Sequence, residues 1–131
     1  MKMKTITVRT RSKDDLIDIT GEISQYISET DITEGMCVVF TPHTTAAITI
    51  NENADPDVQT DMISGLNGLA FERMSFRHGE GNSPAHIKSS LIGCSETIII
   101  HDGKPVLGTW QGIYLCEFDG PRTRKVHIQV L

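Results

Sequence analysis

The residues of this sequence best suited to chemistry are two histidines that flank a glycine-containing loop. His78 comes directly before the loop and His86 comes after it, with Gly79 and Gly81 between them. Glycine allows the left-handed or tightly turned backbone that such a loop needs. Imidazole titrates near neutral pH and binds metal ions, so this stretch is a candidate for acid–base or metal chemistry. A surface loop with two solvated histidines is the alternative interpretation.

The chain after this loop has the pattern of a helix that begins beside the histidines. Ser83 is a good N-cap, Pro84 suits the first helical position, and Gly93 is placed to end the helix. A loop that runs into a helix N-terminus presents free backbone N–H groups and a partial positive charge to phosphate or carboxylate. The phosphate-binding residues predicted here are Gly79, Gly81, Asn82 and Ser83.

A third histidine, His43, precedes an alternating segment at residues 44–52. In a regular strand His43 and Asn51 project to the same side, and a solvated polar face is the alternative. If the fold brings His43, His78 and His86 together, their neutral imidazoles can bind Zn²⁺ and leave a position open for water or substrate. They can instead serve as a general acid and a phosphate-binding imidazolium. None of their spacings is that of a common short zinc motif.

Polar residues of a second group lie in the last quarter of the chain. Glu117 and Asp119 are carboxylates at the end of a predicted strand, an arrangement that suits Mg²⁺, and Arg122 can clamp a phosphate with two parallel hydrogen bonds. A surface ion pair is the alternative. Trp110 and Gln111 offer an aromatic face and an amide to a flat heterocycle, although Trp110 also suits the core or an interface.

The hydrophobic pattern predicts a chain of strands with helices in its first two-thirds. A stripe at helical spacing predicts a first helix that ends near Thr30; its members are Leu16, Ile19, Ile23, Tyr26 and Ile27, with Ser12, Asp14 or Asp15 as the cap. Asp55 and Pro56 predict the start of a second helix. Short apolar or alternating runs predict strands at residues 4–11, 36–41, 44–52, 97–101, 104–109, 110–119 and 122–131.

These elements predict an α+β fold of mostly antiparallel sheet packed with two or three helices, in one domain over residues 1–131. Asp102 and Gly103 predict a tight hairpin turn. In the last strand, the inward positions are expected at Val126, Ile128 and Val130.

Composition excludes several classes of protein. The net charge of −5 and the pI near 5.4 argue against a nucleic-acid partner and against an anionic membrane surface. No apolar run approaches the roughly 20 residues that span a bilayer. The three cysteines, Cys37, Cys94 and Cys116, include no Cys-x-x-Cys pair, so we expect a cytoplasmic protein with reduced thiols packed in strands.

Five motifs together resemble the YjbQ-like family, whose members are often called secondary thiamine-phosphate synthase. The motifs are Thr-Pro-His-Thr-Thr-Ala-Ala at 41–47, Asn-Glu-Asn at 51–53, His-Gly-Glu-Gly-Asn at 78–82 with Ala-His at 85–86, Gly-Thr-Trp-Gln at 108–111, and Glu-Phe-Asp-Gly-Pro-Arg at 117–122. The resemblance covers nearly the whole chain in matching order. It implies an α+β homotrimer with a pocket built around the histidine motifs. It also implies a weak activity that joins an aminopyrimidine methyl diphosphate to a thiazole phosphate and releases pyrophosphate.

The chemistry of this reaction suggests roles for the residues above. His43, His78 and His86 would bind a divalent metal, Zn or Mg, or protonate the departing oxygen, and Glu117 joins them as a catalytic residue. The 79–83 loop, Asp119 and Arg122 would bind the phosphate groups, while Asn51, Trp110 and Gln111 would orient the ring. Two alternatives stay open: a metal-dependent hydrolase that uses the same histidines, and a non-catalytic module that binds a phosphorylated ligand.

Overall fold

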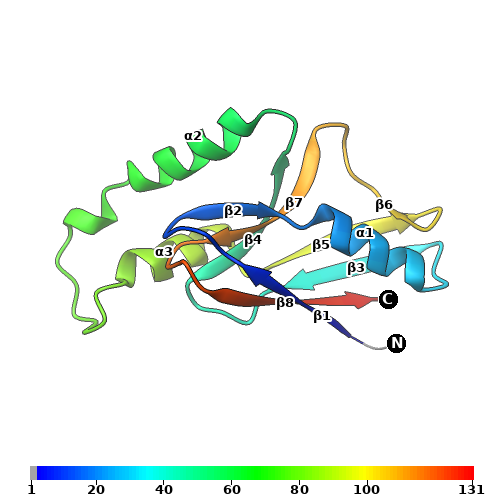
Figure 1. Ribbon diagram of the computed structural model, residues 1–131, viewed down its shortest axis with the longest axis horizontal. Helices are drawn as coiled ribbons and strands as arrows, with labels where there is room; N and C mark the ends of the chain where they lie inside the picture. The colour runs from blue at the N-terminus through cyan, green and yellow to red at the C-terminus, as the bar shows by residue number, and fades with distance from the viewer. Residues whose placement is uncertain (1–2) are drawn as a thin grey trace.

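The computed structural model of the protein describes residues 3–131 and has an α+β fold of two antiparallel sheets and three α-helices within that range (Figure 1). The larger sheet has the strand order β1-β8-β3-β5-β6 and the smaller one has the order β2-β7-β4. Strand bounds are β1 Lys4–Arg9, β2 Asp15–Asp18, β3 Gly35–Phe40, β4 Ala46–Glu52, β5 Ser95–His101, β6 Lys104–Pro105, β7 Gln111–Glu117 and β8 Thr123–Val130. Helix bounds are α1 Thr20–Glu29, α2 Pro56–Asn67 and α3 Ser83–Ile92, with a short 3₁₀ turn at Phe71–Arg73.

The main core lies between the two sheets and α1. Alternate residues of β8 point into it, and Val126, Ile128 and Val130 are fully buried, as the sequence pattern predicts. The smaller sheet contributes Ile48 and Leu115 from the opposite side. Because side chains alternate along a strand, β4 and β7 of the smaller sheet present their other face to a second layer, which contains α3.

That second layer places α3 over the smaller sheet. Ala85 of α3 packs with Ala47 of β4 and with Cys116 and Phe118 of the chain at and after β7. Two polar contacts fix the helix: Ser89 Oγ donates to the Ala46 carbonyl at 2.7 Å, and the Ile48 N–H donates to the Gly93 carbonyl at 3.0 Å. The start of α3 is therefore held beside the ends of β4 and β7.

The first predicted helix is wrong at its start. Leu16 lies in β2, which pairs with β7, so residues 15–18 form a strand rather than the first helical turn. The helix begins at Thr20, whose backbone N–H donates to the Asp18 carboxylate at 2.9 Å. The N-cap residue is Ile19, which makes no side-chain capping bond, so the expectation of Ser12, Asp14 or Asp15 as the cap is wrong, while the expected end near Thr30 is confirmed.

The other helix predictions are confirmed, with one shift. Asp55 caps α2 by accepting a hydrogen bond from the Asp57 N–H, and Pro56 is its first residue. The N-cap of α3 is Asn82, so the prediction of Ser83 is wrong by one residue, while Gly93 ends the helix at φ 100°.

Strand predictions are confirmed in place but are too long at several ends. The Asp102-Gly103 turn joins β5 to β6, with both residues at positive φ, although the returning strand covers only Lys104–Pro105 of the expected 104–109. Asp119 lies beyond the end of β7 and His43 lies before the start of β4. In the described range, no helix has the length and apolar character needed to cross a bilayer.

Two of the three cysteines match their prediction. Cys37 in β3 and Cys116 in β7 are buried, and burial raises the pKa of the Cys37 thiol to about 11 and that of Cys116 to about 12. Cys94 lies outside the strands and is exposed, which contradicts the expectation that all three pack in strands. All three are free thiols.

Candidate functional site

The three predicted histidines line one pocket at the end of the smaller sheet. The pocket has a volume of about 420 Å³, within the usual range for small-molecule sites. Its walls come from the loop before β4, the loop before α3, the first turn of α3, the turn after β7 and the start of β8. The lining residues are Pro42, His43, Thr44, Thr45, His78, Glu80, Asn82, His86, Asp119, Arg122 and Arg124.

His78 and His86 face each other across the loop that separates them. Their ring centroids lie 5.5 Å apart and the ring planes meet at 82°, so the edge of one ring points at the other. The turn that brings them together is closed by a hydrogen bond from the Gly81 N–H to the His78 carbonyl at 3.2 Å. Gly81 has φ 74°, the left-handed conformation expected of a glycine there, whereas Gly79 does not have positive φ.

His43 has a defined tautomer. Its Nε2 accepts a hydrogen bond of 2.9 Å from the backbone N–H of Lys125, so the neutral ring carries its proton on Nδ1. Partial burial of the ring is the main reason that the pKa of His43 lies below its ordinary value. The positive charge of Arg124 adds to this effect, and the Glu117 carboxylate opposes it. His43 therefore offers the pocket a neutral N–H donor.

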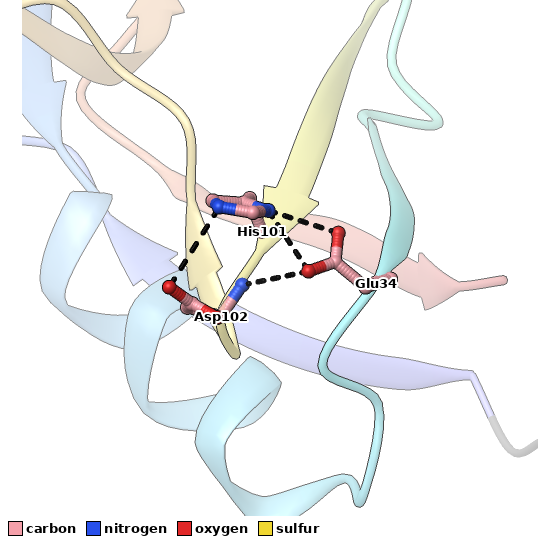
Figure 2. Close-up of side chains that lie close together, drawn as sticks. All are labelled: Glu34, His101 and Asp102. Atoms are coloured by element: carbon pink, nitrogen blue, oxygen red, sulfur yellow. Dashed lines mark hydrogen bonds and ion pairs between the residues drawn. The ribbon is translucent and has the colours of Figure 1, made fainter.

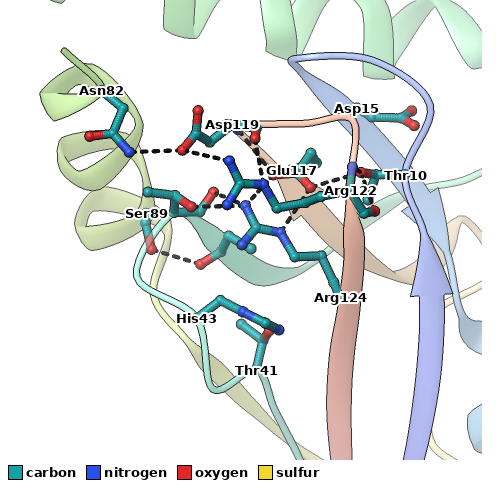
Figure 3. Close-up of polar contacts among 12 residues, drawn as sticks. Thr10, Asp15, Thr41, His43, Asn82, Ser89, Glu117, Asp119, Arg122 and Arg124 are labelled. Carbon is teal, nitrogen blue, oxygen red and sulfur yellow. Dashed lines mark hydrogen bonds and ion pairs between the residues drawn. The ribbon is translucent and has the colours of Figure 1, made fainter. Parts of the chain in front are cut away.

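A buried ion pair between Glu117 and Arg124 lies beside the pocket, and its Arg124 member lines the pocket (Figure 3). Glu117 is fully buried, and its Oε1 accepts from Arg124 Nε and from Thr10 Oγ1, each at 2.8 Å. Its Oε2 accepts from Arg124 Nη2 and from the Asp119 N–H. With both oxygens engaged in this way, Glu117 does not line the pocket. The expected catalytic role of Glu117 stays a prediction, and in the structure its contacts hold Arg124 in place.

Arg124 keeps part of its guanidinium for the pocket. Within residues 3–131 its hydrogen bonds use Nε and Nη2, the latter donating to the Thr45 hydroxyl and carbonyl as well as to Glu117. Arg124 is 2% exposed and lines the pocket, and Nη1 takes no part in these bonds. A fixed, buried guanidinium with free N–H groups is well suited to bind an oxyanion.

Asp119 links the second arginine to the helix. Arg122 donates from Nε to the Asp119 carbonyl at 2.8 Å, and its Nη2 lies 3.2 Å from Asp119 Oδ2. The same Oδ2 accepts from Asn82 Nδ2 at 2.8 Å, as Figure 3 shows at the start of α3. The predicted group of Asn82, Asp119 and Arg122 is therefore assembled at the pocket, with Asp119 as a positioning residue between two donors.

The N-terminus of α3 opens beside these groups. No side chain caps it, and its N-cap residue Asn82 lines the pocket. The ten-residue helix adds its partial positive charge to the two arginines. Of the predicted loop residues, Asn82 lines this pocket. Gly81 lines a second hollow beside it, which shares His78 and Asn82 with the pocket, while Gly79 and Ser83 line neither.

The remaining predicted residues lie at the far end of the same strands. The β4–β7 ladder begins at the pocket with Ala46 opposite Glu117 and ends with Glu52 opposite Gln111. Six residues of extended strand separate the ends by roughly 20 Å. Asn51, Trp110 and Gln111 therefore lie away from the histidines within one chain, and their expected role in orienting the ring stays a prediction. Trp110 is 62% exposed.

The pocket fits a metal ion only in part. His43 Nε2 is engaged by Lys125, and in the described part of the chain the pocket does not bring three histidine or carboxylate ligand atoms within 4.8 Å of one another. The group that does so there is Glu34, His101 and Asp102 (Figure 2), an exposed cluster at the opposite end of β3 and β5. The closeness of these three side chains is explained by their contacts with each other, since His101 Nδ1 lies 2.8 Å from Glu34 Oε1.

Sequence reasoning missed Arg124 and Glu80, which both line the pocket. A signal for Arg124 was present, because it lies in phase with the inward-facing Val126 and Ile128 of its strand. Glu117 likewise lies in phase with the core residue Leu115. Two opposite charges at inward positions of two strands indicate a buried ion pair.

Comparison with known proteins identifies the family that the five sequence motifs resemble, over residues 4–131. The profile of the family described as UPF0047 protein YjbQ-like matches residues 4–131. The chain is 55% identical over 124 residues to UPF0047 protein MJ1081 of Methanocaldococcus jannaschii, which covers 95% of this chain and 90% of the relative. It is 50% identical over 130 residues to UPF0047 protein YugU of Bacillus subtilis, with 98% of both chains covered.

Solved structures agree with the fold. A crystal structure of a YjbQ/UPF0047 family protein from Clostridium acetobutylicum superposes with a TM-score of 0.95 at 51% identity and covers 98% of this chain and 99% of that one. A YbjQ-like protein of unknown function from Sulfolobus solfataricus gives a TM-score of 0.94 at 31% identity, covering 98% and 95%. The chain belongs to the UPF0047 (YjbQ-like) family.

Proposed function

We propose that the protein is an enzyme that acts on phosphorylated small molecules and has the activity of a secondary thiamine-phosphate synthase. One observation carries this proposal: His43, His78 and His86 line one pocket together with Arg122 and Arg124. Two guanidinium groups, a helix N-terminus and several imidazoles make a site for phosphate oxygens.

In the proposed reaction the thiazole nitrogen forms a bond to the methylene carbon of the aminopyrimidine while the bond from that carbon to the diphosphate oxygen breaks. Negative charge collects on the departing diphosphate, which becomes pyrophosphate. Arg122, the free Nη1 of Arg124 and the Nδ1–H of His43 are placed to bind those oxygens. Fixed donors around developing charge are typically the largest contribution to catalysis of this kind.

His78 and His86 are the proposed proton carriers. Because the two rings face each other with their centroids 5.5 Å apart, they are candidates to pass a proton between a phosphate oxygen and solvent. His43 takes a different part because its Nε2 is held by the Lys125 backbone and its Nδ1–H only donates.

The alternative to this proton transfer is a divalent metal, Zn or Mg, held on the His78 and His86 side of the pocket, where Glu80 offers a carboxylate. When bound, such an ion supplies positive charge to phosphate oxygens. Titration of the protein with zinc and with magnesium, monitored by calorimetry, tests this assignment. Binding should be lost in His78→Ala and His86→Ala and kept in His43→Ala. A wild-type protein that takes up neither zinc nor magnesium removes the metal from the proposal.

Two other functions use the same pocket. A hydrolase would use a metal-activated water, and a non-catalytic module would bind a phosphorylated ligand without turnover. The incomplete set of metal ligands favours the synthase over the hydrolase. Product analysis separates the three functions: synthesis gives one joined compound, hydrolysis gives two fragments, and a binding module gives saturable binding with no product.

The test is turnover of the two proposed substrates by wild-type and variant protein. Replacing His78 or His86 by Ala should lower kcat/KM by about tenfold or more, the usual scale of a general acid–base contribution. The matched control is His101→Ala, which removes an exposed imidazole at the other end of the fold. Unchanged turnover in folded His78→Ala and His86→Ala proteins would exclude these rings from the reaction.

We also propose that the protein forms a homotrimer through the outer face of the larger sheet. Met36, Phe40 and Ile99 are exposed there, and Met36 pairs directly with Ile99 across β3 and β5. Contiguous apolar side chains on an open sheet face are typical of an interface. Light scattering should give the mass of three chains for wild type and of one for Met36→Lys/Ile99→Lys. Leu91→Lys, an exposed apolar site on α3, is the control.

A cytoplasmic location is proposed on the basis of the cysteines. All three are free thiols, and Cys37 and Cys116 are buried in strands that leave them unpaired. Reducing compartments keep cysteines in this state. Fractionation of cells with an antibody against the protein tests the location.

A further inference from the structure

A second hollow adjoins the histidine pocket and has a different character. It has a volume of about 330 Å³ and shares His78, Glu80, Asn82 and Asp119 with its neighbour. Its other walls are largely apolar, and a lysine and a glutamate complete them. Those walls are Lys13, Phe71, Glu72, Met74, Phe76, Gly81, Pro84, Ala85 and Phe118.

Aromatic side chains are concentrated in this hollow. The chain has four phenylalanines, and Phe71, Phe76 and Phe118 all line it. Phe118 is buried in the packing beneath α3, whereas Phe76 is 37% exposed and Met74 is 60% exposed. Flat aromatic faces favour stacking with another flat ring. The hollow therefore suits a planar group whose edges remain near the polar pocket.

Asn82 lies at the junction of the two hollows and has an unsatisfied acceptor. Its Nδ2 donates to Asp119, a carboxylate that only accepts, so the amide orientation is fixed and Oδ1 faces away. Asn82 Oδ1 is buried and has no hydrogen-bond partner among the residues that the structure describes. A buried acceptor without a donor is costly, and a ligand that brings an N–H or O–H group removes that cost.

We propose that the hollow of Phe71, Phe76 and Phe118 binds the flat ring of the phosphorylated ligand, and that Asn82 Oδ1 accepts a hydrogen bond from an amino or hydroxyl group on that ring. This inference rests on the proposed function, since the phosphate end must occupy the adjoining histidine pocket. It assigns ring recognition to the residues around α3 in place of Trp110 and Gln111, which lie at the far end of β7.

Calorimetry with three stable phosphonates tests the proposal: methylphosphonate, benzylphosphonate and 2-aminobenzylphosphonate. Benzylphosphonate should bind wild type about tenfold more tightly than methylphosphonate because the ring is buried. Phe76→Ala should abolish that preference and leave methylphosphonate affinity unchanged. Val106→Ala is the control, since Val106 is an exposed apolar side chain just after β6 and outside the hollow. If Phe76→Ala fails to fold, Met74→Ala supplies the same comparison.

The amino group tests Asn82 separately. It should improve affinity about fivefold in wild type, a gain that Asn82→Ala abolishes while the preference for benzylphosphonate over methylphosphonate remains. Equal affinities for the methyl and benzyl compounds would overturn the ring site while leaving the phosphate pocket intact. Failure of all three phosphonates to bind would overturn the proposed function itself, so the two failures are distinguishable. An amino group without effect in wild type would overturn the role of Asn82.

Discussion

The backbone N–H of Lys125 donates a hydrogen bond of 2.9 Å to Nε2 of His43, a residue 82 positions away in sequence. This bond joins the loop before β4 to β8 and fixes which nitrogen of His43 faces the pocket. A main-chain donor cannot be removed by titration, so the ring must rotate or lose this bond before Nε2 can accept a proton. His43 is therefore kept as a neutral N–H donor.

The first prediction concerns the titration of His43. Its pKa should lie below the ordinary value of 6.5, chiefly because the ring is partly buried, and NMR should show the proton on Nδ1. The unfolded chain then binds this proton more readily than the folded one. The contribution to stability is full above pH 6.5 and falls as pH drops toward the lowered pKa. His101, whose pKa is raised by Glu34, is the internal comparison. An Nε2–H tautomer of His43 would contradict this assignment.

The second prediction concerns the buried Glu117–Arg124 pair. Glu117→Gln leaves a buried guanidinium without its countercharge and should lower the free energy of unfolding by about 3–5 kcal/mol, as measured by urea denaturation. The double variant Glu117→Met/Arg124→Met removes both charges and should recover most of that loss. Its phosphate affinity should still be weak, because Arg124 Nη1 is gone. A single variant as stable as wild type would contradict the buried pair.

The fold was largely predictable because its strands and its second and third helices carry local signals. Asp55 and Pro56 begin α2, and the alternation of Val126, Ile128 and Val130 marks the inner face of β8. Leu16 shows where local periodicity fails. It is at helical spacing from Ile19, but residues 15–18 pair with β7, about a hundred residues later, and that pairing decides the structure.

The site was predictable in residue type but not in grouping. His78 and His86 are near in sequence and meet as expected, and His43 joins them because the β4–β7 ladder begins beside the pocket. Trp110 and Asn51 belong to the other end of that ladder. Strand direction and register decide which end a residue occupies, and no local motif carries that information.

The third prediction concerns thiol reactivity. Native protein at pH 8 should react with a thiol reagent at Cys94 alone, because burial raises the pKa of Cys37 to about 11 and that of Cys116 to about 12. The unfolded protein should show all three thiols. Cys94→Ser is the control and should abolish the native reaction. Rapid labelling of Cys37 or Cys116 in the folded protein would show that the strands open.

The fourth prediction concerns the exposed cluster of Glu34, His101 and Asp102 (Figure 2). The hydrogen bond with Glu34 raises the pKa of His101 above 6.5 and lowers that of Glu34 below 4.5. The stabilising effect of the His101 proton is full below pH 6.5 and is lost as pH rises through the raised pKa. The effect of the Glu34 charge is full above pH 4.5 and is lost as pH falls through the lowered pKa.

The cluster should therefore stabilise the fold most between pH 4.5 and 6.5. The difference in Tm between wild type and Glu34→Gln, measured across this range, should be largest there and shrink on both sides. Glu29→Gln on α1 is a matched control without a histidine partner. A Tm difference that does not vary with pH would show that the pair is not formed in solution.

The central claim is that imidazoles from separate parts of the chain surround one oxyanion site. Titration of the protein with pyrophosphate, followed through the ring signals of its five histidines by NMR, tests it most directly. The signals of His43, His78 and His86 should shift together with one saturating curve, while those of His101 and His127 stay in place. Pyrophosphate that leaves the three signals unmoved, or moves them with unrelated affinities, would contradict the claim.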